Sequence, residues 1–105
     1  MQADQVKSLT AHEASGLLAN GEVSSVELTQ AVLDRISTVD ETTHAFVTVT
    51  DDLAWDQATK ADARIAAGDR RPLTGVPMQL KDNICTRGVT TTCSSRMLEN
   101  YVPTY

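Results

Sequence analysis

The most informative stretch of this chain is Gly75-Val76-Pro77-Met78-Gln79-Leu80-Lys81-Asp82-Asn83. Its apolar residues predict a short strand that ends at a lysine, directly before an Asp-Asn turn. A lysine at such a strand end is partly withdrawn from water, and desolvation disfavours the charged form of an amine. A neutral lysine takes a proton from a hydroxyl nucleophile in serine-dependent acyl transfer. Lys81 is therefore the candidate catalytic residue.

Lys81 also admits a plainer interpretation. The residue stands next to Asp82, so its side chain would be solvated or ion-paired there, and spacing alone favours this role. Asp82 and Asn83 are typical residues of turns, in which their side chains bond their own backbone. A second role for Asp82 is to hold the turn that aims Lys81. At the level of the residues, both interpretations stay open.

Two helices with matching start signals precede this stretch. Thr10-Ala11-His12-Glu13 has the S/T-x-x-E spacing of a capping box, and Asn20-Gly21 supplies a stop. The same spacing in Ser24-Ser25-Val26-Glu27 predicts the start of a longer helix. Its apolar residues recur at helical spacing to about Val39, so one face of this helix is apolar.

A third helix is predicted between Thr50, which can cap it, and Gly68, which ends it. Asp56 and Lys60 stand four positions apart, which predicts an ion pair on the exposed side. The opposite face consists mostly of small residues that allow a close approach to a sheet or helix, namely Ala54, Ala58, Ala61 and Ile65.

Three short segments have the composition of strands, namely residues 45–49, 75–80 and 89–93. Ser94 or Ser95 is expected to cap a brief helical turn after the last of them. The order helix, helix, strand, helix, strand, strand predicts an α/β fold.

The charge of the chain is unevenly distributed. The 105 residues carry a net charge of −5, with an acidic excess in residues 1–69 and a basic excess in residues 70–105. An acidic surface repels phosphate backbones, which argues against nucleic-acid binding by the N-terminal part alone. Neither a secretory signal nor an apolar run of membrane-spanning length is found. We therefore expect a cytoplasmic protein without membrane contact and with reduced thiols.

Other reactive side chains have simpler explanations than catalysis. Cys85 and Cys93 have no histidine nearby in the sequence, so we expect buried, inert thiols. His12 and His44 are expected at the surface, and no spacing of Cys or His predicts a metal site. The pair Ser94-Ser95 lacks the glycines of a nucleophile elbow. The glycines are also too far apart for a phosphate-binding loop, so no cofactor site is expected.

The lysine stretch and the residues after it resemble a known enzyme family. Gly75-Val76-Pro77 leading into Leu80-Lys81-Asp82-Asn83 resembles the lysine motif of the amidase signature family. Ile84-Cys85-Thr86-Arg87-Gly88-Val89 and the segment from Thr91 to Pro103 are similar to one branch of that family, the A subunits of aspartyl/glutamyl-tRNA amidotransferases. The upstream helices also resemble that branch, so the similarity spans nearly the whole chain.

The resemblance implies a fold and a mechanism. Residues 1–105 would be the N-terminal part of a single amidase-signature domain, with a helical region at 1–69 and the lysine-motif strand and loop at 70–105. They would supply the helices and first strands of a mixed-sheet fold that is incomplete in this chain. In the family a lysine, here Lys81, acts through a bridging cis-serine on a nucleophilic serine, and glutamine is hydrolysed to release ammonia. Both serines would follow Tyr105, so the chain alone is expected to be inactive.

The resemblance also implies partners. A B subunit would use ATP and the ammonia to convert misacylated Glu-tRNA(Gln) to Gln-tRNA(Gln) in protein biosynthesis, and a C subunit would bridge the two. ATP and glutamine would be used by this heterotrimer, while this chain itself would hold no cofactor. Two alternatives remain open: a stand-alone amidase of the same family that hydrolyses small carboxamides, and a non-catalytic interaction module. The module predicts cooperative unfolding of the isolated chain.

Overall fold

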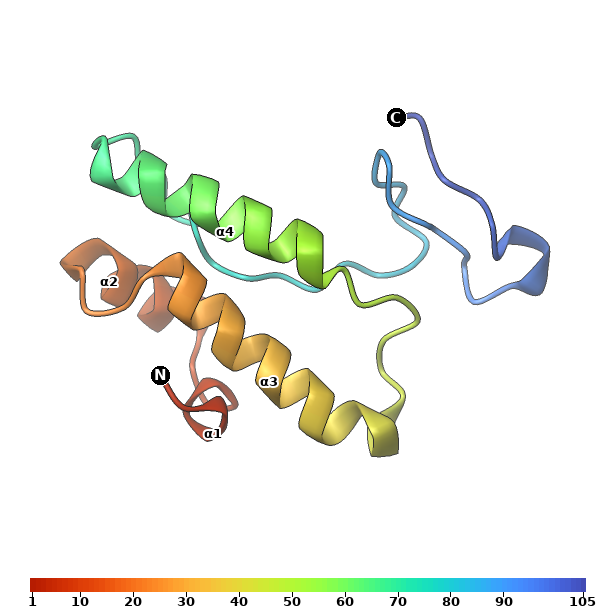
Figure 1. Cartoon of the computed structure of the whole chain (residues 1–105), viewed down its shortest axis with the longest axis horizontal. Coiled ribbons are helices and arrows are strands. Elements are labelled where there is room, and N and C mark those ends of the chain that lie inside the picture. Colours follow the sequence, from red (N-terminus) through yellow and green to blue (C-terminus); the bar gives the residue numbers. More distant parts are fainter. The chain divides into compact units, whose positions relative to one another are not determined.

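The structure is a computed structural model that describes all residues 1–105, and it separates into two units. The helical unit comprises residues 1–43 and 51–77, and the loop unit comprises residues 44–50 and 78–105. The elements, in chain order, are α1 (Ala3–Val6), α2 (Ala11–Asn20), α3 (Ser25–Thr43), α4 (Asp51–Ala66) and the 3-10 helix η1 (Arg96–Leu98) (Figure 1).

Helices α2 and α3 begin with the two predicted capping boxes. The Glu13 amide donates to Thr10 Oγ1 at 3.2 Å, and the Thr10 amide donates back to the Glu13 carboxylate at 2.8 Å. Ser24 and Glu27 exchange the equivalent pair at 3.0 and 2.9 Å. These bonds satisfy amide groups that lack a partner inside the helix, which explains why the short motifs specify both starts. The predicted stop is also confirmed, because Gly21 adopts the left-handed conformation with φ 69°.

Helix α3 is longer than its apolar period predicts. It continues to Thr43, beyond the expected end at about Val39, although the added residues are polar. The Thr43 hydroxyl donates to the Val39 carbonyl at 3.3 Å and to the Asp40 carboxylate at 3.0 Å. A loss of apolar period therefore marks where the buried face of α3 ends, whereas the backbone remains helical for one further turn.

The core of the helical unit lies where α2 and the start of α3 meet. Its buried residues are Ala14, Leu18, Val23 and Leu28, of which Leu28 is 1% exposed. Full burial of a leucine side chain contributes about 1.5–3 kcal/mol. Partly buried apolar side chains surround this cluster: Val6, Leu9, Leu17, Ile65 and Val76.

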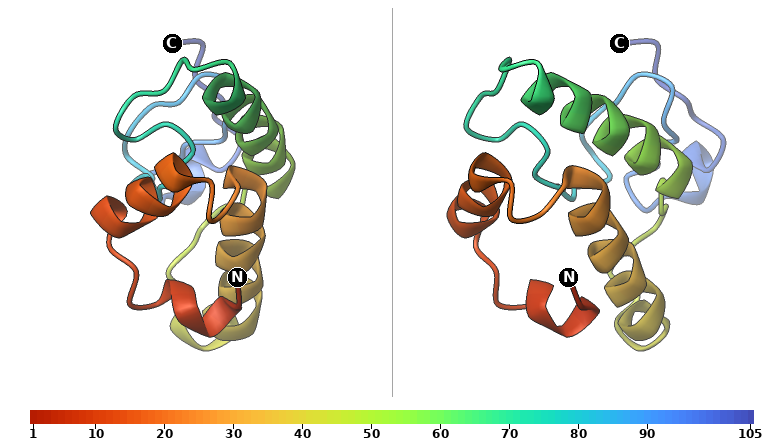
Figure 2. Two further views of the ribbon diagram at one scale, coloured as in Figure 1. Left: turned by 90° about the vertical axis from the view of Figure 1, so that its left-hand side faces the viewer. Right: turned by 60° about the vertical axis from the view of Figure 1, so that its left-hand side comes forward.

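Helices α3 and α4 pack against each other within the helical unit and run in opposite directions (Figures 1 and 2). Ala31 on α3 and Ala58 on α4 are buried, which agrees with the predicted face of small residues on the third helix. On the exposed side of α4, Lys60 Nζ lies 2.6 Å from the Asp56 carboxylate, so the predicted ion pair is confirmed. The predicted end of α4 is confirmed by Gly68, whose φ is +79°.

An aspartate on α4 caps the first turn of α3. The Asp62 carboxylate accepts the Ser25 amide at 2.6 Å and the Val26 amide at 3.1 Å. The Ser25 hydroxyl in turn donates to the Gly75 carbonyl at 2.8 Å. A carboxylate at a helix N-terminus is also favoured by the helix dipole. This junction therefore joins α3, α4 and the segment that leads toward Lys81.

Replacing Asp62 with alanine is expected to destabilise the chain by about 1–2 kcal/mol, because two amides at the start of α3 lose their acceptor. Urea denaturation followed by circular dichroism measures this change. The matched control is Asp56→Ala, which removes an exposed ion pair on the same helix and should cost about 0.5 kcal/mol or less. Equal midpoints for the two variants would contradict the capping role of Asp62.

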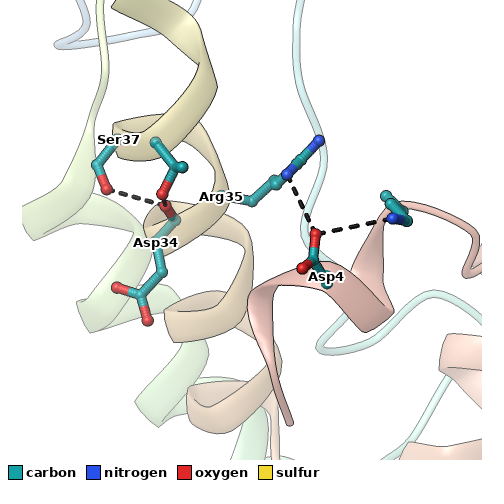
Figure 3. A network of polar contacts seen from close by, with 6 residues as sticks. Asp4, Asp34, Arg35 and Ser37 are labelled. Atoms are coloured by element: carbon teal, nitrogen blue, oxygen red, sulfur yellow. Dashed lines mark hydrogen bonds and ion pairs between the residues drawn. The ribbon is translucent and has the colours of Figure 1, made fainter.

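The short helix α1 was not predicted from the sequence, because its start lacks a Ser, Thr, Asp or Asn cap. Gln2 stands at the N-cap position instead, and Gln5, the third residue of α1, accepts the Gln2 amide at 2.7 Å. α1 packs against α3. The Asp4 carboxylate lies 3.3 Å from the guanidinium of Arg35 on α3 (Figure 3), and 3.7 Å from Lys7 Nζ. These side chains are exposed, and such ion pairs contribute about 0–1 kcal/mol each.

No strand forms in the chain, so the predicted strands at 45–49, 75–80 and 89–93 are not found. A strand exists only when a neighbour completes its ladder of hydrogen bonds, and composition does not supply that neighbour. Two isolated backbone bonds come nearest to a ladder: Thr91 N–H to the Tyr101 carbonyl and Gly88 N–H to the Pro103 carbonyl, both at 3.0 Å. The architecture of this chain is therefore helices followed by loops.

None of the helices combines the length and the apolarity that crossing a lipid bilayer requires.

Candidate functional site

Lys81 opens a tight turn in the loop unit. The Ile84 amide donates to the Lys81 carbonyl at 3.0 Å, which closes the turn over residues 81–84. The lysine side chain is exposed and takes part in none of the chain's four ion pairs. The exposed side chain agrees with the plainer interpretation of a solvated lysine, although no ion pair with Asp82 forms, and the predicted partial withdrawal from water is not found in this chain.

Asp82 points instead to a segment ten residues further along the chain. One carboxylate oxygen accepts the Thr92 amide at 2.9 Å, while the other accepts the Thr92 hydroxyl and, at 3.4 Å, the Ser94 amide. The Asp82 carbonyl accepts the Cys93 amide at 2.8 Å. We call this set of residues, Asp82 with Thr92, Cys93 and Ser94, the Asp82 clamp. The prediction that Asp82 bonds its own turn is wrong, since its partners lie in a different segment.

The clamp holds two residues in an uncommon backbone conformation. Cys93 has φ 51° and Ser94 has φ 56°, both in the left-handed region that non-glycine residues seldom adopt. Such a conformation costs about 1–3 kcal/mol for each residue and persists only where other interactions hold it. Here the amide groups of both residues donate to Asp82. Thr92, which donates both its amide and its hydroxyl to Asp82, is buried at 6% exposure.

Hydrogen bonding lowers the pKa of Asp82 below its ordinary value. The Thr92 hydroxyl is the largest cause of the lowered pKa, followed by the Thr92 amide; burial acts in the opposite direction, and the Ser94 amide adds a further lowering effect. Each of these donors stabilises the ionised carboxylate and not the neutral acid. The clamp is therefore strongest when Asp82 is charged.

We expect Thr92→Val to raise the pKa of Asp82 toward its ordinary value, because the hydroxyl donor is lost. Carbon-detected NMR titration of the Asp82 carboxyl measures this directly. Since the folded-state pKa is lowered, the carboxylate stabilises the fold above the pKa of the unfolded chain, and this contribution is lost as the pH falls through the folded value. An unchanged pKa in Thr92→Val would contradict the bonding described above.

The two thiols are exposed, so the prediction that Cys85 and Cys93 are buried is wrong. Cys93 belongs to the Asp82 clamp, whose turned backbone directs its side chain outward. Cys85 Sγ lies 3.8 Å from the Tyr105 hydroxyl. Hydrogen bonding to Tyr101 and then to Cys85 raises the pKa of Tyr105 to about 12, so this phenol stays protonated.

The remaining candidates have structural roles or none. Ser95 caps η1 by accepting the Met97 amide at 3.3 Å, as one of the two predicted caps. The histidines His12 and His44 are exposed, as predicted. No group of three His, Cys, Asp or Glu side chains is arranged to hold a metal ion. Lys81 with the Asp82 clamp is therefore the candidate site of this chain.

The chain matches a known protein family over most of its length. Residues 27–105, which contain the whole candidate site, match the protein-family model described as Amidase. The chain belongs to the amidase family. Within this family, Lys81 lies in the matched region together with all members of the Asp82 clamp.

Several amidase-family relatives are similar over almost the whole chain. A protein of Geobacter sp. (strain M21) is 54% identical over 96% of the chain, and one of Desulforapulum autotrophicum is 52% identical over the same share. A protein of Dehalococcoides mccartyi (strain ATCC BAA-2100) is 52% identical over 97% of the chain. Each is named as the A subunit of a glutamyl-tRNA(Gln) amidotransferase. The chain spans 21% of the length of each of these relatives.

Proposed function

We propose that this chain is part of the glutamine-hydrolysing subunit of a tRNA-dependent amidotransferase, in which Lys81 is the catalytic base. The similarity to relatives with that subunit name, at 54% identity over 96% of the chain, carries the proposal. It is supported by the position of Lys81, whose side chain is exposed and unpaired on a turn that hydrogen bonds hold in place.

The proposed chemistry needs Lys81 in its neutral form. A neutral amine accepts a proton from a bridging cis-serine, which in turn deprotonates the serine that attacks the side-chain amide of glutamine. An acyl-enzyme forms, ammonia leaves, and water releases glutamate. Neither serine is assigned to a residue of this chain, so the proposed reaction requires the longer protein.

The surroundings of Lys81 support its desolvation in that longer protein. Leu80 before it and Ile84 after it are 46% and 51% exposed, and Met78 is 77% exposed. Removing apolar side chains of such exposure from water lowers the free energy, so their burial by another part of the protein is favourable. We propose that the rest of the amidase domain, including a mixed sheet to which residues 75–80 contribute, covers these side chains and withdraws the amine from water.

The proposal assigns the later steps to partners. Ammonia passes to a B subunit, which uses ATP to activate the glutamate of Glu-tRNA(Gln) and amidates it to Gln-tRNA(Gln), and a C subunit bridges the two in a cytoplasmic heterotrimer. This chain holds neither ATP nor another cofactor in the proposal. The acidic excess in residues 1–69 is consistent with leaving tRNA binding mainly to the B subunit.

The experiment compares the purified 105-residue chain with the longer subunit that contains it, each mixed with glutamine. We expect ammonia release from the longer subunit within its complex and none from the chain alone, because the attacking serine lies outside it. Glutaminase activity of the chain alone would contradict the proposal. Hydrolysis of small carboxamides by the longer subunit without tRNA or partners would favour the stand-alone amidase.

A further inference from the structure

We propose that Asp82 is a positioning residue for Lys81, whose turn it fixes by clamping residues 92–94. This inference rests on the function proposed above for Lys81 and adds a residue to it. Three observations support it. Asp82 accepts several hydrogen bonds, these bonds hold Cys93 and Ser94 in a left-handed backbone conformation, and Asp82 forms no ion pair with Lys81.

Lys81 and Asp82, which are adjacent in the chain, both accept hydrogen bonds that restrict the backbone. The Lys81 carbonyl accepts the Ile84 amide at 3.0 Å. Asp82 accepts donors with its carbonyl and with both carboxylate oxygens. Because these bonds restrict rotation about the backbone of Asp82, they also restrict the direction in which the chain presents Lys81. The backbone of Lys81 is therefore held in place, while its side-chain amine is exposed and forms no ion pair.

The clamp is maintained against a conformational cost. Two consecutive non-glycine residues, Cys93 and Ser94, are left-handed, and each costs about 1–3 kcal/mol. The Ser94 amide is shared between Asp82, at 3.4 Å, and the Thr92 hydroxyl, at 3.1 Å. The bonds to Asp82 offset this cost, so they fix the position of residues 92–94 relative to Asp82.

The clamp also occupies the carboxylate with other partners, so that it forms no ion pair with the amine. An ion-paired carboxylate would stabilise the charged ammonium, whereas a catalytic base must be neutral. The Asp82 oxygens are engaged by Thr92 and Ser94, and no ion pair to Lys81 forms. Asp82 can thus hold the turn next to Lys81 without becoming its counter-ion.

The first experiment uses Asp82→Asn in the longer subunit within its complex, with Asp56→Asn as the control. Asparagine keeps one acceptor oxygen but replaces the other by a donor, so the Thr92 hydroxyl and the Ser94 amide lose the oxygen of residue 82 to which both donate. We expect kcat for glutamine hydrolysis to fall about 10–100-fold, as for a misplaced catalytic group, with KM changed less than about threefold. Product formation from external ammonium should match the control. Full kcat, or equal loss of both activities, would overturn the positioning role.

The second experiment separates the hydrogen bond from packing at Thr92. Thr92→Val keeps the buried volume and removes the hydroxyl, whereas Thr92→Ser keeps the hydroxyl and removes a methyl group. If positioning through Asp82 matters, Thr92→Ser retains most of the glutamine-hydrolysing kcat and Thr92→Val loses about as much as Asp82→Asn. The opposite order would show that Thr92 acts by packing and would overturn the inference.

The activity of Lys81→Ala distinguishes a failure of this inference from a failure of the proposed function. If Lys81→Ala hydrolyses glutamine at the normal rate, the proposed function fails whatever Asp82 does. If Lys81→Ala is inactive and Asp82→Asn is normal, the proposed function stands and the positioning role is overturned. We expect the double variant to be no less active than Lys81→Ala, because a residue that acts only through Lys81 has nothing left to position.

Discussion

Lys81→Ala is expected to lower the rate of glutamine hydrolysis by roughly 10²–10⁴-fold, the range that general-base catalysis typically contributes. Alanine has no group that accepts the proton of a serine hydroxyl, so the nucleophile would attack without activation. The side chain is exposed in this chain and makes no ion pair, so its removal should leave the local fold intact. Ammonia release by the purified complex is the measurement.

Lys81→Arg sharpens this prediction. Arginine keeps the positive charge and much of the length of lysine, but in a protein it does not give up its proton. We therefore expect Lys81→Arg to be as inactive as Lys81→Ala. Activity close to the unaltered rate in Lys81→Arg would mean that Lys81 acts through its charge, for example by attracting an anionic group, and not as a base.

The second large effect is expected at Gly75. This residue has φ +86°, and a Cβ atom placed there would lie 3.1 Å from Ser25 Cβ and 3.2 Å from Ser25 Oγ. Both approaches are closer than ordinary contact, and the Ser25 hydroxyl must keep its 2.8 Å bond to the Gly75 carbonyl. Gly75→Val should therefore destabilise the chain by roughly 2–5 kcal/mol, which combines a left-handed β-branched residue with overpacking.

A second glycine provides the control for this prediction. Gly16 lies inside α2, and a Cβ atom there would meet nothing within 4 Å. Gly16→Ala should stabilise the chain by about 0.5–1 kcal/mol, because alanine favours a helix more than glycine does. Urea denaturation of both variants measures the difference. Equal midpoints for Gly75→Val and the unaltered chain would contradict the close contact with Ser25.

The helices could be predicted from the sequence because their signals are local. Thr10 and Glu13, or Ser24 and Glu27, bond across a single helical turn, so the residues that specify each start are also its partners. The cap that Asp62 adds to α3 bridges residues 36–37 positions apart and has no local signature. The sequence therefore indicates where α3 begins but not which residue joins it to α4.

The strands and the clamp could not be predicted for a related reason. Composition marks residues 75–80 as extended but cannot name the neighbour that a ladder needs. Asp82 next to Asn83 is typical of a local turn, whereas its partners lie at 92–94 in a left-handed conformation that Cys93 and Ser94 do not signal. The sequence offered one indication of the clamp: a catalytic Lys81 needs a fixed turn, and Asp82 is the adjacent residue that could hold it.

The most direct measurement is the yield of Gln-tRNA(Gln) from the complex that contains Lys81→Ala, with either glutamine or external ammonium as the nitrogen source. We expect normal product formation from ammonium and almost none from glutamine, because only ammonia release uses Lys81. Normal product formation from glutamine in this variant would contradict the role of Lys81 as the base.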